Sequence, residues 1–253
     1  MSDPTPPFSE RLRQLLNQKF MHHYRFYQPQ DLSLEQWQAI DQGNFEPFLK
    51  LHVTKVLDRI SVDRATMIRN ALREHGSLAG QTLLDLGCNT GFFSHYFARQ
   101  GMTVTGIDSN SHNAVKGTTA DAATSVIATA ERLSRAYHLS ATFIERDIFS
   151  YLETKPSFDN VLCLSLFHHF FEVGIGYGVT QEKDTDHLFA QIAAVAKKRL
   201  YFEIDHRLAD RHGWLEADLP KLLQEKGGFS QVNLIGLSVD AWQRYRNLYE
   251  CRR

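Results

Sequence analysis

The sequence has few cysteines and no long apolar run. Its three cysteines, Cys88, Cys163 and Cys251, are widely separated and form no Cys-x-x-Cys pair, so a disulfide framework is not expected and a reduced, cytoplasmic protein is favoured. No stretch reaches the ~18 consecutive apolar residues that a membrane span requires. The first residues lack the basic and apolar regions of a secretory signal. We therefore expect no membrane partner.

An excess of charge of either sign is also missing. The 28 basic and 29 acidic residues give a net charge of -1, which is not the basic footprint that nucleic-acid binding produces. The densest basic run, Lys197-Lys198-Arg199, follows an apolar helical pattern. We interpret it as favourable charge at a helix C-terminus. Nucleic acid is therefore not an expected partner.

What the chain does have is enough apolar sequence for a real core. Of its 253 residues, 43% are hydrophobic and 23% charged, as in ordinary globular proteins and unlike disordered ones. A nucleotide-binding α/β core needs only ~150–170 residues, which leaves about 80 to explain. We assign this excess to residues 1–79, a helical N-terminal extension or cap, with helices expected at about 47–59 and 65–75.

After Gly80, short apolar runs alternate with helical patterns. This alternation predicts an α/β fold with a doubly wound, mostly parallel seven-stranded sheet over residues 80–253. No helix separates the last two strands, so an antiparallel strand is expected at the C-terminal end. The expected strands are 82–86, 103–107, 142–148, 158–166, 199–204, 231–237 and 246–251, and the expected helices are 92–100, 120–137, 185–197 and 215–224.

The most informative segment is Asp85-Leu86-Gly87-Cys88-Asn89-Thr90-Gly91, in which a buried strand enters a glycine turn. The turn opens the helix that begins at Phe92-Phe93. Glycines without a Cβ let the backbone approach a ligand closely. No Gly-Lys-Ser/Thr follows, so this is not a P-loop, and the spacing is not the Gly-x-Gly-x-x-Gly of NAD-binding folds.

Three acids end three successive strands of the predicted sheet: Asp85, Asp108 and Asp147. Asp108 stands twenty-one residues after Gly87, where an acid can hold the two ribose hydroxyls of a nucleotide. Asp147 suits a contact to an adenine amino group, with Ile148 packing on the ring. Any one of these acids could instead cap a helix. Three in succession favour a ligand site.

Together these residues resemble the class I S-adenosylmethionine-dependent methyltransferases. Residues 85–91 look like the family's glycine-rich motif, and residues 158–165 look like its fourth-strand motif beside the methyl group. The resemblance implies a Rossmann-like fold and S-adenosyl-L-methionine as cofactor. The cofactor-binding residues that it implies are Asp85, Gly87, Cys88, Asn89, Gly91, Phe92, Phe93, Asp108, Ser109, Asp147, Ile148, Ser165 and Leu166.

A narrower resemblance concerns Gly91-Phe92-Phe93-Ser94 and residues 164–169. These segments look like the methyltransferase domain of bifunctional kinase–methyltransferases that terminate O-antigen polysaccharides. No kinase-like segment is present, so at most the methyltransferase half is shared. We expect O-methylation of a small molecule or of a sugar or phosphate terminus, by a monomer or homodimer. An RNA methyltransferase, or a non-catalytic protein that retains the pocket, stays open as an alternative.

Three residues are candidates for catalysis: His168, His169 and Glu203. A hydroxyl acceptor must lose a proton, and a histidine just past the fourth strand has a suitable pKa to take it. Glu203 ends the next strand, where hydrogen bonding to substrate is its expected use. No metal site is predicted, although a divalent ion held by Glu203, Asp205 and His206 with one of the histidines is the open alternative.

Overall fold

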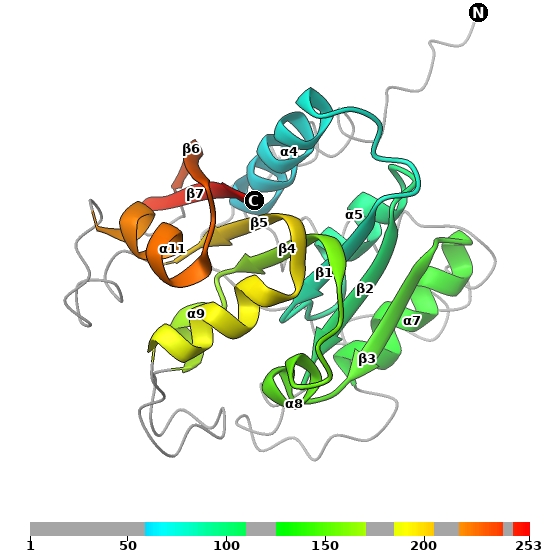
Figure 1. Ribbon diagram of the computed structural model, residues 1–253. Helices are drawn as coiled ribbons and strands as arrows, with labels where there is room; N and C mark the ends of the chain where they lie inside the picture. Colours follow the sequence, from blue (N-terminus) through cyan, green and yellow to red (C-terminus); the bar gives the residue numbers. More distant parts are fainter. Residues whose placement is uncertain (1–58, 110–124, 171–184, 205–217, 240–244) are drawn as a thin grey trace, which may run out of the picture.

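The computed structural model describes residues 59–109, 125–170, 185–204, 218–239 and 245–253 (Figure 1). The helix expected at 47–59 lies outside these residues except for its last one. Asp205 and His206, two of the residues named for the alternative metal site, also lie outside the described residues. Within the described segments, no helix is long and apolar enough to cross a membrane.

The predicted sheet is confirmed. Seven strands lie in the order β3-β2-β1-β4-β5-β7-β6, and all pairs are parallel except β5 with β7 and β7 with β6. The chain therefore winds outward from β1 through β2 to β3, and then in the other direction from β4. The strands are β1 (Thr82–Leu86), β2 (Thr103–Asp108), β3 (Ala141–Glu145), β4 (Phe158–Leu164), β5 (Ala196–Glu203), β6 (Gln231–Val239) and β7 (Tyr245–Arg252).

Helices cover both faces of the sheet (Figure 1). Side chains alternate between the faces along each strand, so Leu83 packs in one core cluster and Leu84 in the other. The first face carries α4 (Arg59–Glu74), α5 (Phe92–Ala98) and α7 (Val126–Tyr137). The second carries α8 (Ile148–Leu152), the 3-10 turn η4 (Phe167–Phe170), α9 (Thr185–Ala194) and α11 (Leu219–Gly227).

Helix α4 belongs to the core of the sheet domain. Its apolar residues Ala65, Ile68 and Leu72 are fully buried and share a cluster with Leu83 of β1 and Tyr201 of β5. The helix already includes Arg59, the first described residue, and so extends to the N-terminal side of the expected second helix. The division of the chain at residue 80 stays a prediction, but the described part of the first segment packs as one layer of the fold.

Several element boundaries differ by a few residues from the sequence expectation, and two of the differences bear on the predicted site and charges. Strand β3 ends at Glu145, three residues early, because Asp147 caps α8 through a hydrogen bond from the Ser150 backbone N–H to its Oδ1 at 2.9 Å. The run Lys197-Lys198-Arg199 lies in β5 and not at a helix end. The apolar sequence before it continues from helix into strand without a glycine or proline to mark the change.

The three cysteines, Cys88, Cys163 and Cys251, are free and buried. Cys163 and Cys251 lie in β4 and β7, and burial raises the pKa of both thiols. They are therefore neutral packing residues within the core.

Candidate functional site

The site lies where the winding of the sheet reverses, at the carboxyl ends of β1 and β4. Ligands of open α/β sheets bind at this position because the loops after the two strands diverge there. The glycine turn follows β1, and Ser165 and Leu166 follow β4. The two loops touch: a Cβ on Gly87, whose φ is +68°, would lie 2.8 Å from Cδ1 of Leu166. Only glycine fits that position without displacing Leu166.

The turn is built from left-handed backbone. Gly91 caps the N-terminus of α5 with φ +82°, and a Cβ there would meet the ring of Phe143 at 2.8 Å and the His95 ring at 2.9 Å. Asn89 is left-handed as well, with φ 51°, and its Oδ1 accepts a hydrogen bond from the Thr90 N–H at 2.7 Å. An asparagine tolerates this conformation better than most side chains do. The turn thus presents backbone to the switch point.

Asp85 lies beneath the turn and is only 3% exposed. Its Oδ2 accepts a hydrogen bond from Ser94 Oγ of α5 at 2.6 Å. Burial raises the pKa of this carboxyl to about 7, although the hydrogen bonds from Ser94 act in the opposite direction. A buried acid that titrates near neutral pH is well suited to oppose a cation that enters the site.

Asp108 ends β2 beside the turn. Its Oδ2 accepts a hydrogen bond from the Asn89 backbone N–H at 2.9 Å. Strands β1 and β2 are in register, with Asp85 opposite Gly106, so the two predicted acids lie on neighbouring strands at the same edge. The structure therefore brings together the glycine turn and the acid that the sequence predicted for ribose. Ser109 follows as an exposed residue.

Cys88 lies in the glycine turn and Phe92 and Phe93 directly follow it, and all three pack toward the apolar core. Cys88 is buried, and its Sγ lies 3.6 Å from the Asn89 carbonyl oxygen. Phe92 and Phe93 are half-buried and meet edge to face, with ring centroids 5.2 Å apart. Both pack against the α4 side of the core. His95, which the sequence analysis missed, is buried one turn further along α5, and burial lowers its pKa to about 4.

Asp147 and Ile148 lie further along the same edge, after β3. Asp147 is exposed, and its Oδ1 accepts hydrogen bonds from the Ser150 N–H at 2.9 Å and the Ser150 hydroxyl at 3.0 Å. Ile148 is only 6% exposed and belongs to the core. The helix-capping alternative for Asp147 is thus present in the structure. A second role toward adenine stays a prediction, since the other carboxylate oxygen is not engaged by the cap.

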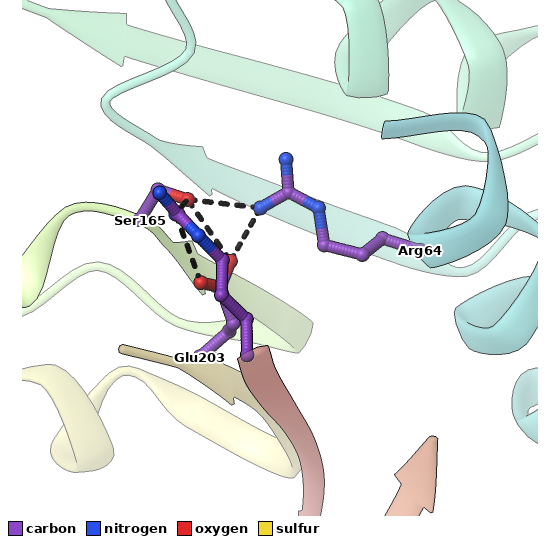
Figure 2. Close-up of polar contacts among 4 residues, drawn as sticks. Arg64, Ser165 and Glu203 are labelled. Carbon is purple, nitrogen blue, oxygen red and sulfur yellow. Dashed lines mark hydrogen bonds and ion pairs between the residues drawn. The ribbon is translucent and has the colours of Figure 1, made fainter. Parts of the chain in front are cut away.

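Four side chains form a buried polar network at the carboxyl ends of β4 and β5 (Figure 2). Glu203 is fully buried and pairs with Arg64 and with Arg246, whose Nη1 lies 3.1 Å from Glu203 Oε1. Ser165 joins the three charges: its hydroxyl donates to Glu203 Oε2 at 3.0 Å and accepts from Arg64 at 2.9 Å and from Arg246. Burial opposes ionisation of Glu203, but the two guanidinium groups hold its pKa below the usual value.

Sequence reasoning missed Arg64 and Arg246. Each could have been found because it occupies a position on a helix or strand face whose other residues are buried. Arg64 lies four and eight residues before the buried Ile68 and Leu72 on the same face of α4. Arg246 lies on the same face of β7 as the buried Leu248 and Glu250. A charged residue at such a position needs a partner, because an unpaired buried charge is very costly.

His168 and His169 lie in η4, the turn that follows the end of β4. Their side chains lie outside the described part of the structure, so the prediction that one of them acts as a base stays a prediction. Among the described residues, no group of three potential metal-binding side chains is found.

Comparison with known proteins agrees with this geometry. Residues 84–199 match the family model described as a methyltransferase domain. The chain carries a methyltransferase domain. Its fold and motifs are those of the class I, S-adenosylmethionine-dependent type, as the sequence resemblance implied. The match begins in β1 and ends in β5, so it includes the glycine turn, Asp108 and the end of β4.

Curated relatives of this methyltransferase domain share about a quarter of its residues. The chloroplastic magnesium protoporphyrin IX methyltransferase of Arabidopsis thaliana is 25% identical over 164 residues, which are 62% of this chain and 45% of that protein. The ubiquinone biosynthesis O-methyltransferase of Photorhabdus laumondii is 26% identical over 129 residues, which are 51% of this chain and 43% of that protein. The chain thus spans about half the length of these relatives.

Solved structures share the fold of the methyltransferase domain. Magnesium protoporphyrin IX methyltransferase from Synechocystis PCC 6803, determined with bound SAM, has a TM-score of 0.55 at 20% identity and covers 85% of this chain and 94% of its own. The bifunctional kinase–methyltransferase WbdD also has a TM-score of 0.55 at 20% identity, and covers 95% of this chain and 46% of its own.

Proposed function

We propose that the protein transfers the methyl group of S-adenosylmethionine to an oxygen of a small molecule or of a sugar or phosphate terminus. The observation that supports this most is the contact between the glycine turn and Asp108. It joins the backbone of the glycine turn to the acid that we assign to the ribose, at the switch point where open α/β sheets bind their ligands. The relatives named for O-methylation add support for oxygen as the acceptor atom.

The residues present fit the cofactor. Gly87 and Gly91 allow a tight backbone turn where a Cβ would collide with neighbouring side chains, and Asp85 is a buried acid that can face a cation. We assign Gly87, Asn89 and Gly91 to the methionine part, Asp85 to its amino group and Asp108 to the ribose hydroxyls. Asp147 and Ile148 are assigned to adenine, and Ser165 and Leu166 to the neighbourhood of the methyl group.

The bound cofactor supplies an activated methyl group on a sulfonium. The task of the chain is then to align the acceptor oxygen and to exclude water around the positive charge. We propose His168 or His169 as the base that takes the acceptor's proton. Glu203 is a poor base, because it is fully buried and held ionised by two arginines. We therefore propose that Glu203 positions Ser165 and does not exchange a proton with substrate.

A screen of acceptors with S-adenosylmethionine labelled in its methyl group tests this function. We expect label in an acid-stable product from phosphorylated or hydroxylated sugars or from a small phenolic or carboxylic acceptor. Asp108→Ala should abolish the transfer. Label recovered only in RNA, with activity that falls steeply as salt rises, would instead favour an RNA methyltransferase. S-adenosylhomocysteine binding with no transfer to any acceptor would favour the non-catalytic alternative. We further propose a cytoplasmic monomer or homodimer.

A further inference from the structure

The end of β4 is held in an unfavourable backbone conformation. Ser165 has φ 52°, in the left-handed region that side chains other than glycine, asparagine and aspartate rarely adopt. Such a conformation persists only where surrounding contacts fix it, and it often marks a functional position. Leu166, the next residue, is the one that packs against Gly87 of the cofactor turn. The conformation of Ser165 therefore sets where Leu166 meets the turn.

The hydroxyl of Ser165 has all of its hydrogen-bonding capacity in use. It donates to Glu203 at 3.0 Å and accepts from Arg64 at 2.9 Å and from Arg246. A serine hydroxyl has one donor and two acceptor positions, so these three contacts satisfy it completely. The two arginines are 4% and 7% exposed, and at such low exposure charge-assisted hydrogen bonds are strong. The network therefore fixes both the side chain and the backbone of Ser165.

Arg64 makes a second contact that the rest of the network lacks. Its guanidinium carbon lies over the Phe93 ring, 5.4 Å from the ring centroid. Phe93 belongs to the first turn of α5. Phe93 follows Gly91 by two residues, so this contact reaches the glycine turn from the side of α4. Arg64 thus touches the first turn of α5, which directly follows the glycine turn, through Phe93. It touches the loop after β4 through Ser165 (Figure 2). It comes from α4, outside residues 84–199 that match the methyltransferase family model.

We propose that Arg64 is a positioning residue of the cofactor site: it holds the loops after β1 and β4 at the spacing that cofactor binding requires. The proposal rests on the proposed function, because it names a residue that serves the same pocket. Arg64 acts through Ser165 and Phe93 and has no contact with the reacting atoms in this account. The pocket thereby depends on a helix that precedes the matched domain.

Binding of S-adenosylhomocysteine, measured by calorimetry, tests the proposal with a matched control. In Arg64→Gln the pocket should loosen, and the dissociation constant should rise about tenfold or more, since a charge-assisted hydrogen bond to Ser165 and a cation–π contact with Phe93 are both lost. Glu203 retains Arg246 as its partner, so the variant should stay folded. His75→Gln removes the contact between the His75 ring and the Glu250 carboxylate, 3.6 Å apart just beyond the other end of α4, and should change the dissociation constant less than about twofold.

Ser165→Ala provides a second variant that does not threaten the fold. It should weaken S-adenosylhomocysteine binding as well. The added effect of Arg64→Gln in the Ser165→Ala background should be much smaller than in the wild type, since both act on one network. Arg64→Lys should recover part of the lost affinity, because its ammonium can pair with the same oxygens.

Wild-type affinity in Arg64→Gln or in Ser165→Ala would overturn the proposal. An equal loss in His75→Gln would also overturn it, because the effect would then come from docking of α4 in general. These outcomes differ from failure of the proposed function, in which the wild-type protein itself binds no S-adenosylhomocysteine.

Discussion

The backbone N–H of Asn89 donates a hydrogen bond to the carboxylate of Asp108 at 2.9 Å. This contact joins the turn after β1 to the end of β2 and fixes the position of both relative to the switch point. It also leaves Asn89 in a left-handed conformation, with φ 51°. The turn is thus ordered by contacts among its own residues, and such preorganisation lowers the entropy cost of binding at the site that we propose.

The tight packing around Gly91 gives a first prediction. Gly91→Ala should lower the free energy of unfolding and weaken S-adenosylhomocysteine binding strongly, because its Cβ would lie 2.8 Å from the Phe143 ring and displace the turn. Gly80→Ala is the matched control. Gly80 has a similar φ of +80° but nothing within 4 Å of a Cβ. It should show only the strain of the left-handed conformation, about 1–2 kcal/mol.

Denaturant unfolding and calorimetry of the two variants separate these effects. If Gly80→Ala and Gly91→Ala bound S-adenosylhomocysteine equally well, the tight packing at the turn would have no role in binding.

The pKa of Asp85 gives a second prediction, which concerns stability against pH. Burial raises this pKa from 3.8 to about 7 in the folded protein. Between these two values the folded state binds a proton that the unfolded state does not, so this group makes stability fall as pH rises through that window. Asp85→Asn removes the titration and keeps an acceptor for Ser94. Its stability relative to the wild type should therefore rise by about 2–3 kcal/mol between pH 5 and pH 8.

The difference between the two proteins is the quantity to measure, by denaturant unfolding at several pH values. The pKa of His95 is lowered to about 4 by burial, and this group makes stability rise with pH below its ordinary value of 6.5. That effect opposes the one from Asp85 in the wild type but cancels when the variant is compared with it. A difference that does not change with pH would contradict a raised pKa for Asp85.

Asp147 gives a third prediction, which separates its two roles. Asp147→Ser keeps an N-cap for α8 but removes the carboxylate, whereas Asp147→Ala removes both. Asp147→Ala should lower stability by about 1 kcal/mol and Asp147→Ser by only a few tenths. Both should weaken S-adenosylhomocysteine binding to a similar degree if the carboxylate faces adenine. Unchanged affinity in both variants would leave Asp147 with the capping role that the structure shows.

The sheet and the glycine turn at its edge could be predicted from the sequence for identifiable reasons. Buried parallel strands are continuous apolar runs, and the glycine turn must be local in sequence because it joins a strand to the next helix. Asp85 and Asp108 could be found because they end such strands. The parallel character of the sheet was predicted from the helices between its strands, and the antiparallel C-terminal edge from the absence of a helix before β7.

The network around Glu203 could not be predicted in the same way. Arg64, Ser165, Glu203 and Arg246 come from α4, the end of β4, β5 and β7, and only the folded sheet brings them together. From sequence, Glu203 was a strand-end acid like the others, so it was expected to face substrate. Its register opposite Leu248 on the antiparallel strand β7 instead places it two residues from Arg246. A pairing across an antiparallel edge leaves no local pattern in the sequence.

The most direct test of the account is calorimetric titration of S-adenosylhomocysteine into the wild-type protein, Asp108→Ala and Asp159→Ala. Asp159 is a matched control, since it accepts a backbone hydrogen bond from Thr82 at 3.0 Å but lies at the start of β4, at the opposite edge of the sheet. We predict that the wild type and Asp159→Ala bind one equivalent and that Asp108→Ala binds at least about a hundredfold more weakly, as expected when a charged group loses its hydrogen bonds to ligand. Absence of binding by the wild type, or unchanged binding by Asp108→Ala, would contradict a cofactor site at this edge.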